Sequence, residues 1–133
     1  MTMTGGCLCG QVRYEIEGEA QVAMVCHCKN CQRQAGSLAS TIIGVPRGAL
    51  QHSGEIKVYA DRGDSGNALE RQFCPNCGSP LFTIAESAPA MIFVKVGTLD
   101  DTSSFKPAMH IFAKSKQEWV DLGDTPAFDT FPG

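Results

Sequence analysis

Three cysteines lie within six residues in the segment CHCKNCQRQAGS, Cys26–Ser37. The chain has seven cysteines, and they form three groups, CLC, CHCKNC and CPNC: Cys7, Cys9, Cys26, Cys28, Cys31, Cys74 and Cys77. An odd number fits poorly with a complete set of disulfides. Clustered cysteines that stay reduced, as in the cytoplasm, favour metal binding.

The segment CPNCG, residues 74–78, is the strongest local signal. A Cys-x-x-Cys pair with a proline inside it and a glycine after it makes a tight turn, so both sulfurs can face one ion while backbone N–H groups donate to the thiolates. The pair needs two more ligands. On an extended strand Cys7 and Cys9 would project to the same face, and Gly10 would leave room for close backbone approach. We therefore predict a structural zinc site on Cys7, Cys9, Cys74 and Cys77.

Two alternatives to this four-cysteine site remain open. Cys7 and Cys9 could be small buried apolar residues instead of ligands. The CPNC motif could also serve dithiol exchange. A redox motif of this kind normally lies between a strand and a helix, whereas here an apparent strand follows it, which favours zinc.

The other three cysteines, Cys26, Cys28 and Cys31, predict a second site. Three protein ligands with one open position are typical of a catalytic zinc. An open zinc lowers the pKa of the group it binds, so that a thiol is bound as thiolate. Three thiolates suit a soft sulfur ligand better than a hydrolytic role. We therefore expect the fourth ligand to be a small molecule.

A protein side chain could also close this second site. His27 is adjacent to two of the cysteines, although on an extended backbone it projects to the opposite side. His52 or His110 could approach from elsewhere in the chain. The three cysteines could also share a purely structural zinc with a residue from another strand.

The elements that position these cysteines are predicted to be mainly short antiparallel strands in an all-β domain, because 14 glycines and 7 prolines divide short apolar segments. In QVRYEIEG, Val12, Tyr14 and Ile16 alternate with charged residues, as in a half-buried strand. Further strands are expected in LASTIIGV, EIKVYA, AMIFVKVG and AMHIFA. LERQFC and SPLFTI would form a hairpin with CPNCG at its tip. One short helix is expected from near Lys29 to just before Gly36.

Length and composition indicate a single domain spanning residues 1–133 that can bury a core without disulfides. The net charge is −3 and the basic residues are scattered. The sequence therefore has no basic patch of the kind that binds nucleic acid or an anionic membrane. The N-terminus MTMTGGCLCG has neither the basic nor the apolar region of a signal peptide, and no apolar segment could span a bilayer. We expect a cytoplasmic protein.

Five segments occur in order along the chain: GGCLCGQVRYEI, CHCKNCQRQAGS, RQFCPNCGSPLF, VKVGTLDD and HIFAKSKQEW. Together they resemble the glutathione-dependent formaldehyde-activating enzyme family, which also contains the centromere protein V domain. The resemblance extends from Gly6 to about Trp119. It implies the all-β fold known as the β-tent, built around a structural zinc site.

The same resemblance implies two zinc ions per chain and a carbon–sulfur lyase activity. The structural ion would lie on Cys7, Cys9, Cys74 and Cys77, and the catalytic ion on Cys26, Cys28 and Cys31. The family's named reaction joins formaldehyde and glutathione into S-(hydroxymethyl)glutathione, so the implied partner is a small thiol such as glutathione or its adduct. Two other functions remain open: a zinc-stabilised binding module without turnover, and a thiol-based redox protein.

Several single residues also carry expectations. Trp119 and Phe112 are expected in the core. Arg62 and Arg71 could meet a carboxylated substrate, although exposed arginines are common. The acidic pair in GTLDD is expected to bond backbone groups in a turn, with paired general acid and base as the alternative.

Overall fold

The computed structural model describes residues 1–132, and the fold is all-β, as predicted. The first sheet is antiparallel, with strands in the order β1 (Thr2–Gly6), β2 (Arg13–Glu17), β5 (Leu50–Ser53). The second sheet has seven strands, in the order β10 (Met109–Ile111), β3 (Val22–Cys26), β4 (Ser40–Pro46), β9 (Met91–Lys95), β8 (Pro80–Ala85), β7 (Ala68–Phe73), β6 (Lys57–Arg62). Only the β10–β3 pair among the described strands is parallel. Within residues 1–132 no helix is long and apolar enough to cross a membrane.

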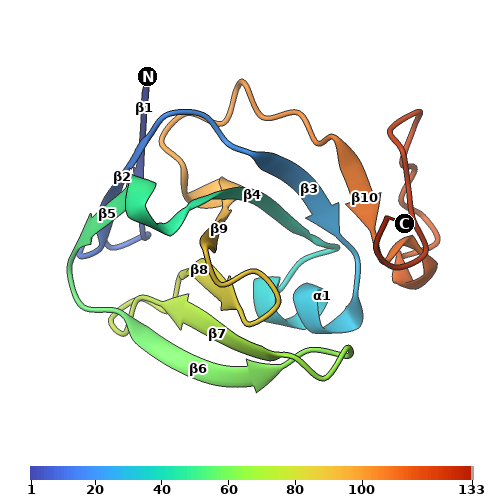
Figure 1. Cartoon of the computed structure of the whole chain (residues 1–133), viewed down its shortest axis with the longest axis horizontal. Helices are drawn as coiled ribbons and strands as arrows, with labels where there is room; N and C mark the ends of the chain where they lie inside the picture. The colour runs from blue at the N-terminus through green and yellow to red at the C-terminus, as the bar shows by residue number, and fades with distance from the viewer. Residues whose placement is uncertain (133) are drawn as a thin grey trace.

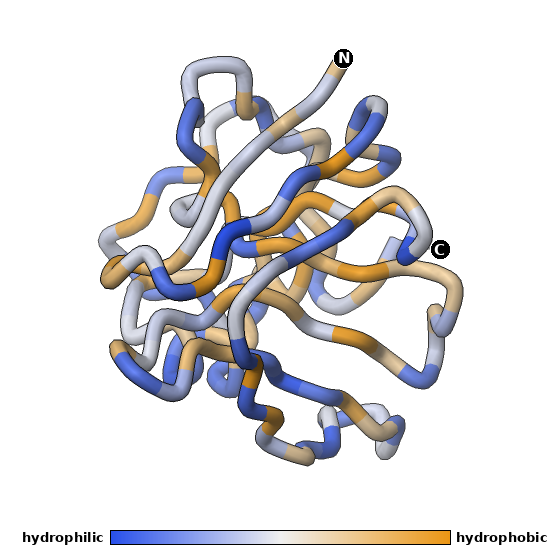
Figure 2. The backbone as a smooth tube through the Cα atoms, turned by 90° about the vertical axis from the view of Figure 1, so that its left-hand side faces the viewer, coloured by the Kyte–Doolittle hydropathy of each residue, from blue (hydrophilic) through white to orange (hydrophobic). Residues whose placement is uncertain are grey.

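The core lies where the small sheet packs against β4, β8 and β9. The alternation predicted for β2 is confirmed, because Tyr14 and Ile16 are buried while Arg13, Glu15 and Glu17 are exposed. Tyr14 packs edge-to-face on Phe82 of β8, with ring centroids 5.2 Å apart. Figure 2 shows hydrophobic and hydrophilic stretches alternating along the chain, with several hydrophobic stretches crossing the middle of the molecule.

The predicted short helix is confirmed as α1, Lys29–Ala35. Cys28 is its N-cap, with its Sγ accepting from the backbone N–H of Cys31 at 3.3 Å. Gly36 ends the helix in the left-handed region, φ +65°, where glycine is favoured. Figure 1 shows that the large sheet is curved and that α1 lies between its β3–β4 part and its β6–β7 part.

The chain beyond β10 lies along the edge of β10 that faces away from β3 (Figure 1). Backbone N–H groups of Phe112 and Ala113 donate to the carbonyls of Thr130 and Phe128, at 3.0 and 2.9 Å. The Phe112 ring, which is partly buried, meets Phe131 edge-to-face. The prediction that Trp119 belongs to the core is wrong. Trp119 lies on this surface segment and is 71% exposed, and its indole N–H donates to the Gln117 side chain at 2.7 Å.

The remaining short elements are three single-turn 3-10 helices within residues 1–132: η1 (Arg47–Ala49), η2 (Val96–Thr98) and η3 (Ala113–Ser115). The helix η2 follows β9 directly and carries Thr98, whose Oγ1 lies 2.7 Å from the hydroxyl oxygen of Tyr14. This hydrogen bond joins the large sheet to β2 through the core.

Candidate metal centres and the cavity beside them

Four cysteines come together from the turn after β1 and from the connection between β7 and β8. The Sγ of Cys9 lies 3.6 Å from that of Cys7 and 3.8 Å from that of Cys74. The sulfurs of all four, including Cys77, lie within 4.8 Å of one another. A tetrahedral ion with zinc–sulfur bonds of about 2.3 Å holds its ligands about 3.8 Å apart. The group therefore has the spacing that a tetrahedral zinc requires.

The backbone reaches this arrangement differently from the sequence prediction. An extended strand was expected at Cys7 and Cys9, but β1 ends at Gly6 and residues 7–10 form a turn, closed by the N–H of Gly10 donating to the carbonyl of Cys7 at 3.1 Å. Gly10 is needed for its φ of +82°, and not for close approach, because a Cβ there would meet nothing within 4 Å. The extended pattern is lost because the turn carries the chain into β2.

Polar groups surround these sulfurs. The backbone N–H of Val12 donates to the Sγ of Cys7 at 3.3 Å. The hydroxyl of Ser79 lies 3.2 Å from the Sγ of Cys77, and this contact, with backbone donors, lowers the pKa of the Cys77 thiol to about 5. Such donors stabilise thiolates, which are the form that binds a metal.

The second group comprises Cys26, Cys28 and Cys31, whose sulfurs also lie within 4.8 Å of one another. Cys26 ends β3, and the other two begin α1, so the strand-to-helix junction gathers all three. Hydrogen bonds from the Cys26 and Cys31 thiols lower the pKa of Cys28 to about 2, and the same contact with Cys28 raises the pKa of Cys26. Negative charge is therefore favoured on Cys28 within this group.

His27 points away from the three sulfurs. Its ring is fully buried on the other side of the chain, with Nε2 2.9 Å from Nδ1 of His110. Burial lowers the pKa of both imidazoles. The backbone carbonyl of His27 accepts from the Gln32 side chain at 2.8 Å, which fixes this conformation. Among the described residues no histidine, His52 included, joins either cysteine group.

A cavity of about 180 Å³ adjoins the three-cysteine group. Its walls are mostly apolar side chains from β3, β4, β9, β10 and the segment after β10: Met24, Ile42, Phe93, Ile111, Phe112 and Phe131. The three sulfurs therefore line a space that a small molecule can enter, whereas the four-cysteine group includes two residues of the main core, Cys7 and Cys74.

Lys95 is a polar residue of this cavity that the sequence analysis missed. It is 8% exposed, and its ammonium donates to the hydroxyl of Ser40. Burial lowers its pKa, while negative charge on Cys31 favours the protonated form. The sequence did carry a signal: Lys95 is two residues from Phe93 and so shares its face of β9.

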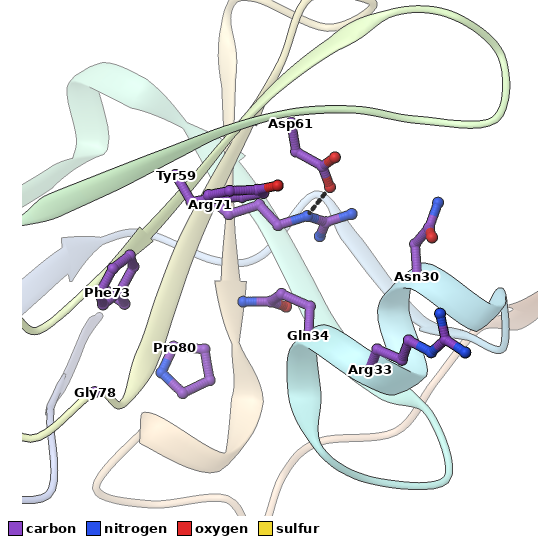
Figure 3. Close-up of a pocket in the computed structure, with 9 residues that line it drawn as sticks. All are labelled: Asn30, Arg33, Gln34, Tyr59, Asp61, Arg71, Phe73, Gly78 and Pro80. Atoms are coloured by element: carbon purple, nitrogen blue, oxygen red, sulfur yellow. Dashed lines mark hydrogen bonds and ion pairs between the residues drawn. The ribbon is translucent and has the colours of Figure 1, made fainter.

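Arg71 also lines the cavity and is 6% exposed. Its Nε donates to Oδ2 of Asp61 at 2.7 Å, and this bond lowers the pKa of the Asp61 carboxyl. Figure 3 shows the open groove on the other side of Arg71, between β6–β7 and α1. Arg62, the other arginine considered from the sequence, bonds the carbonyl of Gly66 and does not line the cavity.

Comparison with known proteins agrees with the architecture. A crystal structure of a Rhodobacter sphaeroides protein is similar in fold, with a TM-score of 0.59 and 22% identity over 95% of this chain and 100% of that chain. No curated protein sequence matches at a significant level. The family model described as "Glutathione-dependent formaldehyde-activating enzyme" matches residues 2–115. The chain belongs to the glutathione-dependent formaldehyde-activating enzyme family.

Proposed function

We propose that this protein is a zinc-dependent carbon–sulfur lyase-type enzyme that acts on a small thiol adduct, similar to S-(hydroxymethyl)glutathione synthase. Cys7, Cys9, Cys74 and Cys77 hold a structural zinc, and Cys26, Cys28 and Cys31 hold a catalytic zinc. The observation that carries the proposal is that three converging sulfurs, which no described histidine joins, line a cavity of about 180 Å³. Membership of the family supports the thiol and aldehyde chemistry.

The buried charge of Lys95 supports a metal at the three-cysteine site. The ion pairs formed within residues 1–132 are Arg13–Asp100 and Arg71–Asp61, so no carboxylate lies beside the Lys95 ammonium. A buried cation without an opposite charge is costly. Three thiolates around a divalent ion carry one net negative charge, which the Lys95 ammonium compensates. The three cysteine sulfurs and the buried Lys95 ammonium are thus both compatible with a zinc ion at this site.

The residues around the cavity have complementary roles. When bound, zinc would supply an open position that takes a thiol sulfur as thiolate. Phe112 and Phe131 give this space an apolar wall, and the Ser40 hydroxyl with the Lys95 ammonium offers donors to an oxygen of the ligand. Breaking the carbon–sulfur bond of a hydroxymethyl thioether releases a thiolate, an aldehyde and the hydroxyl proton. An apolar cavity lining with a few oriented hydrogen-bond donors suits that reaction.

Metal content and thiol binding test the proposal together. Protein purified without added metal should contain two zinc ions per chain, and Cys28→Ser should contain one while keeping the β-rich circular dichroism spectrum. In cobalt-substituted protein, 2-mercaptoethanol should change the visible spectrum, because an open position admits a new sulfur ligand. Two ions per chain with no spectral change on adding thiol would show that both sites are closed, which contradicts the proposal.

Turnover needs its own measurement. NMR exchange spectroscopy of formaldehyde mixed with a thiol reports how fast the hydroxymethyl adduct forms and breaks. The zinc-loaded protein should accelerate this exchange, and Cys28→Ser should not. Thiol binding without any acceleration would indicate the zinc-stabilised binding module instead of an enzyme.

A further inference from the structure

Arg71 separates two hollows that lie on either side of its side chain. One is the cysteine cavity, and the other is the open groove of about 460 Å³ between α1 and the β6–β7 hairpin (Figure 3). Arg71 extends from β7, and its guanidinium borders both spaces, as does Asn30 of α1. A molecule in the cavity therefore meets a buried cation at the wall shared with the groove.

The guanidinium of Arg71 has N–H groups that are not used in its ion pair with Asp61. Its Nε is paired with Asp61, and the terminal nitrogens have no acceptor among the described residues, although they are not enclosed by protein atoms. Figure 3 shows these nitrogens directed toward α1, where Asn30 lies. Two parallel N–H groups of a guanidinium match the two oxygens of a carboxylate.

The charged groups around the cavity limit where an anion could bind. Its charged residues within the described chain, apart from the cysteines, are Lys95, Arg71 and Asp64. Asp64 already accepts from the Asn30 side chain at 3.2 Å, and Lys95 is balanced by the three thiolates with their metal. Asp61 is paired with the Nε edge of Arg71, so a ligand carboxylate would meet the other edge of the guanidinium, to which no described carboxylate is bonded.

The size of the cavity limits what connects the sulfur to the carboxylate. A cavity of about 150 Å³ is enough for a benzene-sized molecule, and this one is about 180 Å³. The space accommodates a thiol with a few carbons, and its apolar walls suit a short alkyl chain. A tripeptide thiol is larger and would have to extend past Arg71 into the groove.

We infer that the three-cysteine site takes a small mercaptocarboxylate, with its sulfur at the open position and its carboxylate on the guanidinium of Arg71. The inference rests on the proposed function and specifies its substrate class. This substrate class also distinguishes the three-cysteine site from a site that binds a tripeptide thiol.

Binding to the cobalt-loaded protein, followed in the visible spectrum, tests this assignment. The probes are 3-mercaptopropionate and 3-mercaptopropionamide, which have similar shape and differ in charge. The carboxylate should bind about tenfold more tightly, as expected for a charge-assisted pair. Glutathione should bind more weakly than 3-mercaptopropionate.

Variants at Arg71 assign the preference to this residue. Arg71→Gln should bind both probes equally and bind the amide as well as the parent does. Arg71→Lys should keep part of the preference, because it keeps the cation without the paired donors. Asp61→Asn is the matched control: it breaks the same ion pair but leaves the guanidinium, so the tenfold preference should persist.

The outcomes separate the inference from the proposed function. Equal affinity of the parent for both probes overturns the carboxylate assignment while leaving the open metal position intact. A preference that survives Arg71→Gln but disappears in Lys95→Met overturns the role of Arg71. Tighter binding of glutathione overturns the size argument. If neither probe changes the spectrum, the inference and the proposed function both fail.

Discussion

The sulfur atoms of Cys9 and Cys74 lie 3.8 Å apart, although 65 residues separate them in the chain. Cys9 belongs to the turn that follows β1, and Cys74 follows β7 of the large sheet. A metal held by this group would join the two sheets at one point. The binding free energy of such an ion contributes directly to the stability of the fold.

Replacing a ligand of this group should therefore destabilise the protein. Cys74→Ser is expected to lower the melting temperature by about 10 °C or more, because Cys74 is fully buried and its metal joins distant segments. Differential scanning calorimetry measures the change. Cys31→Ser, at the other group, is the control and should melt closer to the parent. A Cys74→Ser variant as stable as the parent would refute the structural assignment.

The paired imidazoles predict that histidine is not a ligand of the second metal. The Nε2 of His27 is bonded to Nδ1 of His110 and faces away from the sulfurs. His27→Gln and His110→Gln should each keep two zinc ions per chain by elemental analysis, whereas Cys28→Ser should keep one. Loss of one ion from either glutamine variant would show that a histidine completes the site.

The ion pair between Arg13 and Asp100 predicts a dependence of stability on pH. Hydrogen bonds from Arg13 and Thr4 hold the pKa of the Asp100 carboxyl below its usual 3.8. A depressed carboxyl pKa stabilises the folded state above the usual value, and this contribution is lost as the pH falls through the folded-state pKa. Asp100→Asn should therefore melt only slightly below the parent at pH 7, because the ion pair is exposed to solvent, and the difference should shrink below about pH 4.

Thermal melts of both proteins from pH 3 to pH 7 measure this effect. Asp124→Asn is a suitable control, because Asp124 is exposed and forms no ion pair within the described chain. A difference between Asp100→Asn and the parent that stays constant across the range would contradict the role of the pair.

Close packing at Gly5 predicts a steric effect. A Cβ at this position would overlap the carbonyl oxygen of Thr98 and the hydroxyl of Tyr14, both of which are held in the core. Gly5→Ala should lower the free energy of unfolding by about 2 kcal/mol, as for other overpacked sites. Gly48→Ala is the matched control, because a Cβ there meets nothing within 4 Å. Urea denaturation measures both, and equal stability of the two variants would contradict the argument.

Much of the fold could be predicted from local patterns. The alternation of Val12, Tyr14 and Ile16 predicted β2, because period-two burial is visible within a few residues. The helix between Lys29 and Gly36 was predicted from a short segment ended by a glycine, and its bounds are confirmed. The three cysteine groups were also evident, since their spacing is part of the sequence.

Other features depended on which segments pack together. The turn at Cys7 and Cys9 was mistaken for a strand, because Cys-x-Cys spacing fits both conformations and only the path of the chain into β2 distinguishes them. Trp119 was predicted in the core, and it is 71% exposed, because the burial of a large side chain depends on whether another element covers it, which the local sequence does not show.

The cysteine chemistry was thus determined by the sequence, and the surroundings of the cysteines by the tertiary structure. Residue types and spacing decide which sulfurs are available to a metal. The burial of Lys95 and the position of Arg71 between two hollows depend on β9, β7 and α1 meeting around the three cysteines. These elements are distant in the chain. The environment of a charged side chain depends on the residues that the fold brings next to it, and these cannot be read from its neighbours in the sequence.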